Sequence, residues 1–217
     1  MTLVQTVNQA SVTTTLASSA NPAAFGQPVT FTDTVCPAPP STNPTLPPSG
    51  TVTFRDGSTL LGTGTLAPGG GAHCAQATLT WSNLAPGTHT ITASYGGDGN
   101  YLAGPLESLT QTVTCTRTVT GTVGTVLATT GSTCVLNATV NGPVLVQPGA
   151  ALFVSDSTVA TGIDSRGATQ FGVCGSRITG AVNVAETTGG SIRISVDTLI
   201  KGVTDELADG SPDRVGS

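Results

Sequence analysis

Apolar and polar residues alternate along residues 84–101, between a Pro-Gly turn and a second turn rich in Gly and Asp. Successive side chains of a strand point to opposite faces, so His89, Ile91, Ala93 and Tyr95 share one face, while threonines and a serine share the other. One largely apolar face and one polar face are typical of an antiparallel sheet with one buried side. We therefore expect the rest of the N-terminal half to supply partner strands.

Further segments before residue 115 show the same alternation and are bounded by Gly, Pro, Asn and Asp. The predicted strands are 12–16, 29–35, 51–55, 59–66, 77–81, 88–95 and 109–114. Asp33 shares a face with three apolar residues, which predicts a place near a sheet edge. Short strands separated by turns indicate an all-β fold, with an antiparallel β-sandwich over residues 11–114 and a linker over residues 1–10.

A different repeat follows Cys115, with V-x-G-x-V segments and a period of 19 residues. Two registers show this spacing: Val140, Val159 and Ile178 in one, and Val154, Val173 and Ile192 in the other. Such a period is typical of a solenoid, in which each coil buries its apolar residues by stacking on the next. Without a helical period inside each unit, the pattern predicts a short right-handed parallel β-helix of about four coils over residues 115–194.

The last segment, residues 195–217, allows two interpretations. Its apolar residues fall at helical spacing, with acidic residues opposite. They are Val196, Leu199, Ile200, Val203 and Leu207. A short amphipathic helix could cap the last coil, whose open strand edges would otherwise invite pairing with another chain. The alternative is a disordered tail.

Charged residues make up only 9% of the chain, and the net charge is −5. The seven basic residues are scattered, so no basic patch exists to bind a phosphate backbone, and we expect no nucleic-acid partner. Neither end shows a signal peptide or an apolar run of about 20 residues, so we expect no membrane insertion. We interpret the chain as part of a longer exported protein.

Five cysteines lie in surroundings rich in Gly, Thr and Ser, without a C-x-x-C pair. Their spacing favours disulfides and hence an oxidising compartment. Cys36 and Cys74 bracket the proline-rich insert of the sandwich, and we predict that they pair. Cys115 and Cys134 are one coil apart at the start of the solenoid, within the range that a disulfide requires, and form the second predicted pair. Cys174 is left over, either for a partner beyond this chain or as a buried apolar residue.

Several ordered motifs carry a family resemblance that covers about residues 11–114. They are Asn21-Pro22, the run from Phe25 to Phe31, Gly50 to Phe54 with Asp56-Gly57, Leu61-Gly62, and Leu84 to Ala93 with Tyr95, Asp98, Asn100 and Tyr101. These motifs resemble the bacterial Ig-like repeat of secreted and surface-anchored proteins. The resemblance implies a spacer, stalk or adhesin module and no catalytic residue. The proline-rich insert, Cys36 and Cys74 depart from the simplest repeats. The second half resembles, in pattern only, right-handed β-helices of extracellular bacterial proteins.

Metal and calcium sites find little support in the sequence. His73, Cys74 and His89 offer two imidazoles without a neighbouring carboxylate, so we expect no metal site. Asp98 and Asn100 could offer oxygens to calcium, but the EF-hand spacing is absent, and a turn is the preferred interpretation. Asp156, Asp164 and the Asp205-Glu206 pair could likewise offer oxygens to calcium. We predict no cofactor.

Enzymatic and ordered-surface functions also lack a pattern. Asp156, Asp164 and Glu186 do not recur at the 19-residue offset, which argues against a polysaccharide-active β-helix. A threonine ladder would require Thr139, Thr158 and Thr179 to hold one register, and we predict that they do not. The favoured hypothesis is a non-enzymatic extracellular structural or adhesive module, with a surface glycan, a protein ligand or neighbouring domains as partners. A virion or surface-layer component and a polysaccharide-active enzyme are the alternatives.

Overall fold

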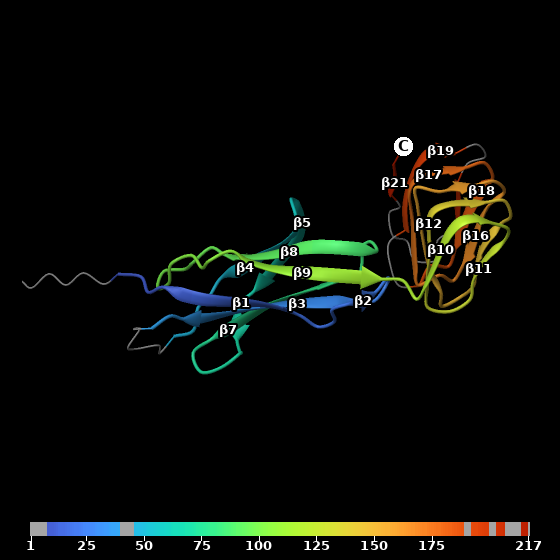
Figure 1. The fold of residues 1–217 in the computed structure, drawn as a ribbon. Helices are drawn as coiled ribbons and strands as arrows, with labels where there is room; N and C mark the ends of the chain where they lie inside the picture. The colour runs from blue at the N-terminus through green and yellow to red at the C-terminus, as the bar shows by residue number, and fades with distance from the viewer. Residues whose placement is uncertain (1–7, 40–45, 189–191, 200–202, 207–213, 217) are drawn as a thin grey trace, which may run out of the picture. The chain divides into compact units, whose positions relative to one another are not determined.

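The computed structural model describes residues 8–39, 46–188, 192–199, 203–206 and 214–216, and every regular element in that part of the chain is a strand (Figure 1). The chain folds as two compact units. The first comprises Met1–Pro22, Pro28–Trp81 and Thr88–Thr112. The second comprises Ala23–Gln27, Ser82–Gly87 and Val113–Ser217. The N-terminal half is a two-sheet sandwich, and the C-terminal half is a solenoid.

One sheet of the sandwich has the strand order β1-β3-β7-β6, with antiparallel pairing throughout. Its strands are β1 (Val12–Ser18), β3 (Val29–Pro37), β7 (Ala75–Trp81) and β6 (Ala67–Pro68). The other sheet has the order β2-β9-β8-β4-β5. Its strands are β2 (Ala23–Ala24), β9 (Glu107–Thr114), β8 (Gly87–Tyr95), β4 (Thr51–Asp56) and β5 (Thr59–Thr65). All seven predicted strands are present, and the two-residue strands β2 and β6 were not foreseen.

The core of the sandwich follows from the period-two pattern of its strands. Phe31, Phe54, Ile91 and Tyr95 are among the largest fully buried side chains, and each alternates with a more exposed neighbour on its strand. The predicted edge position of Asp33 is wrong, because β3 has β1 on one side and β7 on the other. Asp33 is therefore enclosed in the core, with 1% of its surface exposed.

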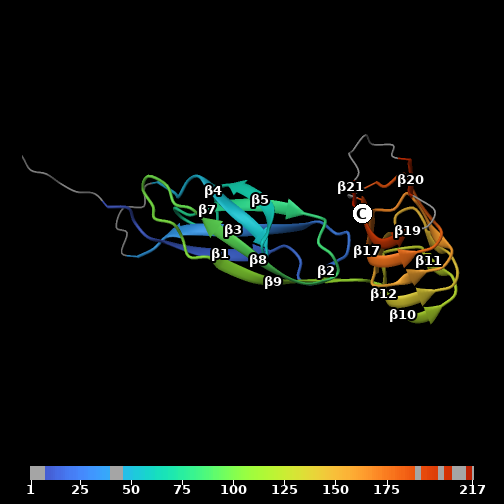
Figure 2. The ribbon, with the colours of Figure 1, turned by 90° about the horizontal axis from the view of Figure 1, so that it is seen from above.

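The solenoid stacks parallel strands into two sheets (Figure 2). The first has the order β10-β12-β14-β17-β19-β21, with β15 paired to β12 and β17. Its strands are β10 (Arg117–Val123), β12 (Ser132–Val140), β14 (Ala151–Ser155), β15 (Thr158–Val159), β17 (Gln170–Ile178), β19 (Ile192–Leu199) and β21 (Arg214–Gly216). The second sheet has the order β11-β13-β16-β18-β20. Its strands are β11 (Val126–Ala128), β13 (Val144–Val146), β16 (Gly162–Arg166), β18 (Ala181–Ala185) and β20 (Val203–Glu206).

The predicted 19-residue column is present, because Val140 pairs with Val159 and Val159 with Ile178. The second predicted register is correct from Val154 to Val173 but wrong at Ile192, since Val173 pairs with Ile194. The reason is that the last coil is two residues longer than the middle coils. The shift is even, so the buried face is preserved.

The C-terminal helical cap is wrong. Residues 192–199 form β19 and residues 203–206 form β20, which pairs Val203 with Val182. The apolar residues at helical spacing instead extend the stack, because the preceding coil offers a complete row of backbone partners. Ile200 and Leu207 lie outside the described residues, as do residues 210–213 and 217 of the proposed disordered tail, whereas residues 214–216 form β21.

One corner of the solenoid repeats in three successive coils. Asn137, Asp156 and Gly175 have positive φ angles of 48°, 50° and 50°, and each is followed by a small residue. In two coils that small residue is a serine, whose hydroxyl bonds to the backbone at the turn. The Ser157 hydroxyl donates to the Ser155 carbonyl at 2.7 Å, and the Ser176 hydroxyl accepts from the Ser157 amide at 3.1 Å. These bonds satisfy backbone groups that the turn would otherwise leave unpaired.

Candidate functional site

The sandwich contains the first predicted disulfide. Cys36 near the end of β3 and Cys74 just before β7 are bonded, with Cα atoms 4.3 Å apart and a sequence separation of 38. The alternating strands place them together, because Val35 and Ala75 are partners in the β3–β7 ladder. The bond closes a loop that contains the proline-rich insert, β4, β5 and β6. It therefore constrains the unfolded chain over more than a third of the domain.

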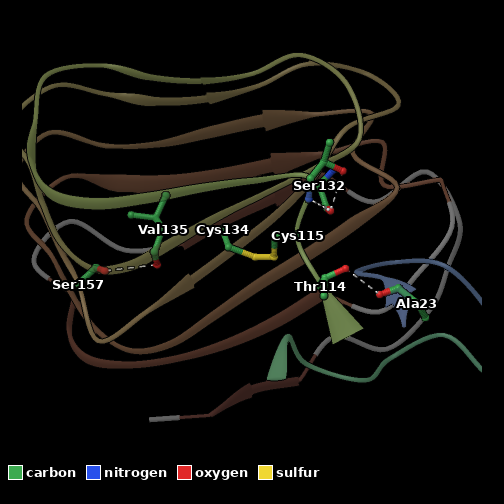
Figure 3. Close-up of a disulfide and its surroundings, with 8 residues drawn as sticks. Ala23, Thr114, Cys115, Ser132, Cys134, Val135 and Ser157 are labelled. Atoms are coloured by element: carbon green, nitrogen blue, oxygen red, sulfur yellow. Dashed lines mark hydrogen bonds between the residues drawn. A yellow bond between two sulfur atoms is a disulfide. The ribbon is translucent and has the colours of Figure 1, made fainter. Parts of the chain in front are cut away.

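The solenoid contains the second disulfide, between Cys115 and Cys134 (Figure 3). Their Cα atoms are 5.9 Å apart across a sequence separation of 19. Cys134 is buried on β12, and the bond ties the start of the first coil to the second. Beside it, the Ser132 hydroxyl accepts a hydrogen bond from the Thr116 amide at 3.0 Å. Covalent and polar contacts together fix the first coil.

Cys174 has no disulfide partner and is half-buried on β17. Burial raises the pKa of its thiol, Arg193 lowers that pKa, and Asp156 raises it. The net direction is upward, so the protonated thiol is favoured. Of its two predicted roles, a small and weakly reactive packing residue agrees with this environment.

The histidines do not assemble with Cys74. His89 on β8 contacts Asp56 at the end of β4, with 2.7 Å between Nδ1 and Oδ2. Cys74 is committed to its disulfide, and His73 lies in the preceding loop with a φ angle of 66°. Within the described ranges, no three His, Cys, Asp or Glu side chains are grouped so that they could hold a metal ion. The contact with Asp56 was not foreseen from the sequence, because the register of β4 and β8 creates it.

Asp98 organises the turn that ends the alternating stretch. Its Oδ1 accepts hydrogen bonds from the Asn100 and Tyr101 amides at 2.7 and 2.8 Å. Its Oδ2 accepts from the Ser49 amide and hydroxyl at 2.8 and 2.7 Å. Burial alone would raise the pKa of Asp98, but these four bonds outweigh it and lower the pKa to about 2. The carboxylate is therefore a structural acceptor that joins two loops.

Asp33 is a further carboxyl group of the sandwich, and unlike Asp98 it has no such partners. Neither of its oxygens has a hydrogen-bond partner within the described chain. Burial and, to a smaller extent, the charge of Glu107 raise its pKa to about 6. Its alternation with Phe31 and Val35 indicated the inward face, but the sheet order needed to see its full burial is not written in the sequence.

The solenoid carboxylates lie on separate elements. Asp156 occupies the corner after β14 and accepts a hydrogen bond from the Ser155 hydroxyl at 2.7 Å. Asp164 on β16 is 3.7 Å from exposed Arg166, and Glu186 follows β18 with a φ angle of 56°. Asp205 and Glu206 fall on β20.

Two outward columns run along the solenoid. Thr139 and Thr158 share one register, but Arg177 takes the next position in place of Thr179, so the three threonines do not hold one register, as predicted. The second column, which we call the outer column, runs across β11, β13, β16 and β18. It consists of Leu127, Leu145, Asp164 and Asn183 in successive coils. The two leucines are 42% and 36% exposed, so an exposed apolar pair precedes a polar pair along the column.

Comparison with known proteins agrees with this architecture. Residues 13–114 match the profile of the bacterial Ig-like domain (group 3) family. A search of curated proteins returns no match. Separately, no helix in the described ranges is long and apolar enough to cross a membrane. Residues 13–114 therefore form a bacterial Ig-like domain, followed over residues 117–195 by a β-solenoid-like stretch of about four turns.

Proposed function

We propose that this chain is a non-enzymatic structural module of an exported bacterial protein and serves as a spacer with an adhesive surface. The observation that carries the proposal is an Ig-like domain of a bacterial family with a disulfide in the sandwich and another at the start of the solenoid. Disulfides persist in oxidising compartments, which supports a place outside the cytoplasm. Bacterial Ig-like domains are typical of surface or exported proteins.

The adhesive part of the proposal depends on the solenoid surface. Repeated coils present similar side chains at regular intervals, as Thr139 and Thr158 do in neighbouring strands. Each hydroxyl offers one weak contact, so useful retention on a surface requires many contacts at once. A surface glycan or a protein ligand is the expected partner, and neighbouring domains of a longer chain would supply further copies.

The compartment is tested by a peptide map of protein folded under oxidising conditions, compared before and after reduction. The expected result is a Cys36–Cys74 and a Cys115–Cys134 peptide, each lost on reduction. Free thiols at both Cys36 and Cys74 would overturn the extracellular assignment. Cys174 provides an internal control, because its free thiol should react with a thiol reagent in either sample once the protein is denatured.

The adhesive role is tested by retention on insoluble peptidoglycan and on cellulose. Monomeric chain should be retained weakly, and the same chain held as a tetramer on a protein scaffold should be retained at least about tenfold more strongly. The variant Thr139→Ala/Thr158→Ala is the matched test of the threonine column. Equal retention of the scaffold alone would refute adhesion, and release of reducing sugar from the glycan would establish the enzymatic alternative.

A further inference from the structure

The first and last segments of the sandwich lie side by side along the whole domain. Ala10 forms a parallel bridge with Tyr101, and Ala23 of β2 pairs in parallel with Val113 of β9. Figures 1 and 2 show β1 beside β9 between these two points. Side-chain hydrogen bonds between the two segments join residues 89 to 93 positions apart. We call this set of contacts the terminal-strand seam.

Backbone hydrogen bonds close both ends of the seam. At one end, the Ala10 amide donates to the Asn100 carbonyl and the Leu102 amide donates to the Ala10 carbonyl, both at 2.9 Å. At the other end, the Phe25 amide donates to the Thr114 carbonyl at 2.8 Å. The seam therefore extends from the point where the chain enters the domain to the point where it leaves.

Side chains close the middle of the seam. The Thr14 hydroxyl lies 3.2 Å from Glu107 Oε1 and 3.3 Å from the Pro105 carbonyl oxygen, with hydrogen-bond geometry to both. Four positions further along, the Ser18 hydroxyl donates to Gln111 Oε1 at 2.6 Å. Gln111 is fully buried and Ser18 is half-buried, so their contact is partly shielded from competing water.

Asn21 completes the row with two bonds to the backbone of β9. Its Nδ2 donates to the Thr110 carbonyl at 2.7 Å, and its Oδ1 accepts from the Thr112 amide at 3.0 Å. The Gln111 amide group also donates to the Ala20 carbonyl at 2.8 Å. Side chains thus replace a backbone ladder where β1 belongs to one sheet and β9 to the other.

The parallel direction of the two segments determines how tension would act on them. The chain enters at the start of β1 and leaves at the end of β9, so pulling on the two chain ends draws these parallel segments in opposite directions along their length. The bonds of the seam are then loaded together in shear. An antiparallel pair pulled at one end would instead lose its bonds one at a time, at a lower force.

The disulfide does not bypass this seam. Cys36 follows β1 and Cys74 precedes β9, so the bond joins β3 to β7 and leaves both terminal strands outside its loop. Once the seam opens, β1 and β9 can detach from the sandwich. The loop between Cys36 and Cys74, which are 38 residues apart, stays closed by the disulfide. Resistance to the first opening step therefore depends on non-covalent contacts.

We propose that the terminal-strand seam is the mechanical clamp of the Ig-like domain, the set of contacts that must break before tension on the two chain ends can unfold it. The clamp deepens the proposed spacer function, and its biological use rests on that function, because a spacer between a surface and its target carries tension.

The experiment pulls single molecules of the full oxidised chain through handles on its two ends. Unfolding of the sandwich is recognised by its length, because adding a reductant should lengthen that event by about 130 Å, the extended length of the residues between Cys36 and Cys74. The seam variant is Thr14→Val/Ser18→Ala. The matched control is Thr30→Val/Thr34→Val, which removes the contacts of Thr30 with Thr80 and of Gln76 with Thr34 between β3 and β7.

At a fixed force, the seam variant should unfold the sandwich about tenfold faster than the unmodified chain, with the control within about threefold. An unchanged rate in the seam variant, or equal acceleration in both variants, would overturn the clamp. Asn21→Ala gives a second reading if the double variant does not fold, since it removes two bonds from an exposed side chain. The peptide map and the retention assays measure other properties, so failure of the spacer function is distinguishable from failure of the clamp.

Discussion

Asp33 and Ala77 are direct partners across the β3–β7 ladder, and both side chains point into the core of the sandwich. A carboxyl group therefore lies beside a methyl group, in a place where its neighbours along β3 are Phe31 and Val35. Burying a carboxylate without hydrogen bonds is costly, so the protonated acid is favoured. The consequences can be measured.

The Ig-like domain should lose stability as the pH rises from about 4 to about 6. In this range the folded state keeps the proton on Asp33, whose pKa is raised to about 6, while the unfolded chain releases it near its ordinary value of 3.8. The free energy of unfolding therefore falls by up to about 3 kcal/mol and then stays level. Denaturation followed by the fluorescence of Trp81, on β7, checks this.

The variant Asp33→Asn should remove this part of the pH dependence and raise stability above pH 6. Glu107→Gln is the graded control, because it removes only the smaller of the two causes and should weaken the effect without abolishing it. A pH profile of Asp33→Asn that matches the unmodified chain would contradict the burial of a charged group at this position.

Loss of the sandwich disulfide should lower the free energy of unfolding by about 4 kcal/mol. The reason is that the loop between the two cysteines, which are 38 residues apart, gains conformational freedom mainly in the unfolded state. The double variant Cys36→Ser/Cys74→Ser tests this by chemical denaturation. Cys115→Ser/Cys134→Ser should cost about 3 kcal/mol in the solenoid, since its loop is shorter. Cys174→Ser should leave both values nearly unchanged, and a loss as large as that of either pair would indicate a disulfide that we have not assigned.

A second corner of the solenoid predicts opposite effects for two substitutions. Gly167 has a φ angle of 63°, and an added Cβ would lie 3.0 Å from a side-chain atom of Pro148. Gly167→Ala should therefore lower stability by about 1 to 3 kcal/mol. Glu186 has a similar φ angle of 56° after the next strand, so Glu186→Gly should be neutral or stabilising by up to about 1 kcal/mol. Hydrogen exchange of the solenoid amides measures both, and equal effects would refute the assignment.

Two buried serines should respond differently to removal of their hydroxyl groups. Ser165 lies between Val146 and Val184 in the solenoid core, and its hydroxyl has no partner within the described residues. Ser165→Ala should raise stability by about 1 kcal/mol. Ser157 bonds to two carbonyl groups and accepts from the Ala138 amide, so Ser157→Ala should lower stability by about 1 to 2 kcal/mol. A loss in both variants would show that Ser165 has a partner.

Much of the fold could be predicted because its periods are local. The alternation around His89 to Tyr95 identified β8 and its buried face from side-chain direction alone. The spacing of Val140, Val159 and Ile178 identified the stacking of coils that lie far from the first strands. The prediction failed at Ile192, where two added residues changed the spacing without changing the pattern of apolar residues.

The tail shows why a local period can mislead. A few apolar residues at helical spacing also fit strands, and only the preceding coil decides between the two by offering hydrogen-bond partners. The seam was beyond prediction for a related reason. Thr14, Ser18 and Asn21 look like ordinary polar residues of a first strand, and their partners are about 90 residues away. The burial of Asp33 likewise depends on the order of strands in the sheet.

The constant 19-residue register from β12 through β14 to β17, matched by that from β13 through β16 to β18, has an evolutionary consequence. A duplication or deletion of 19 codons in this region would add or remove one whole coil and leave every remaining pair aligned. The first coil, in which paired residues are 16 to 18 positions apart, and the longer last coil do not share this freedom. The middle of the solenoid is therefore a cassette whose number of copies can change, so that related genes could adjust the reach of the protein without redesigning its ends.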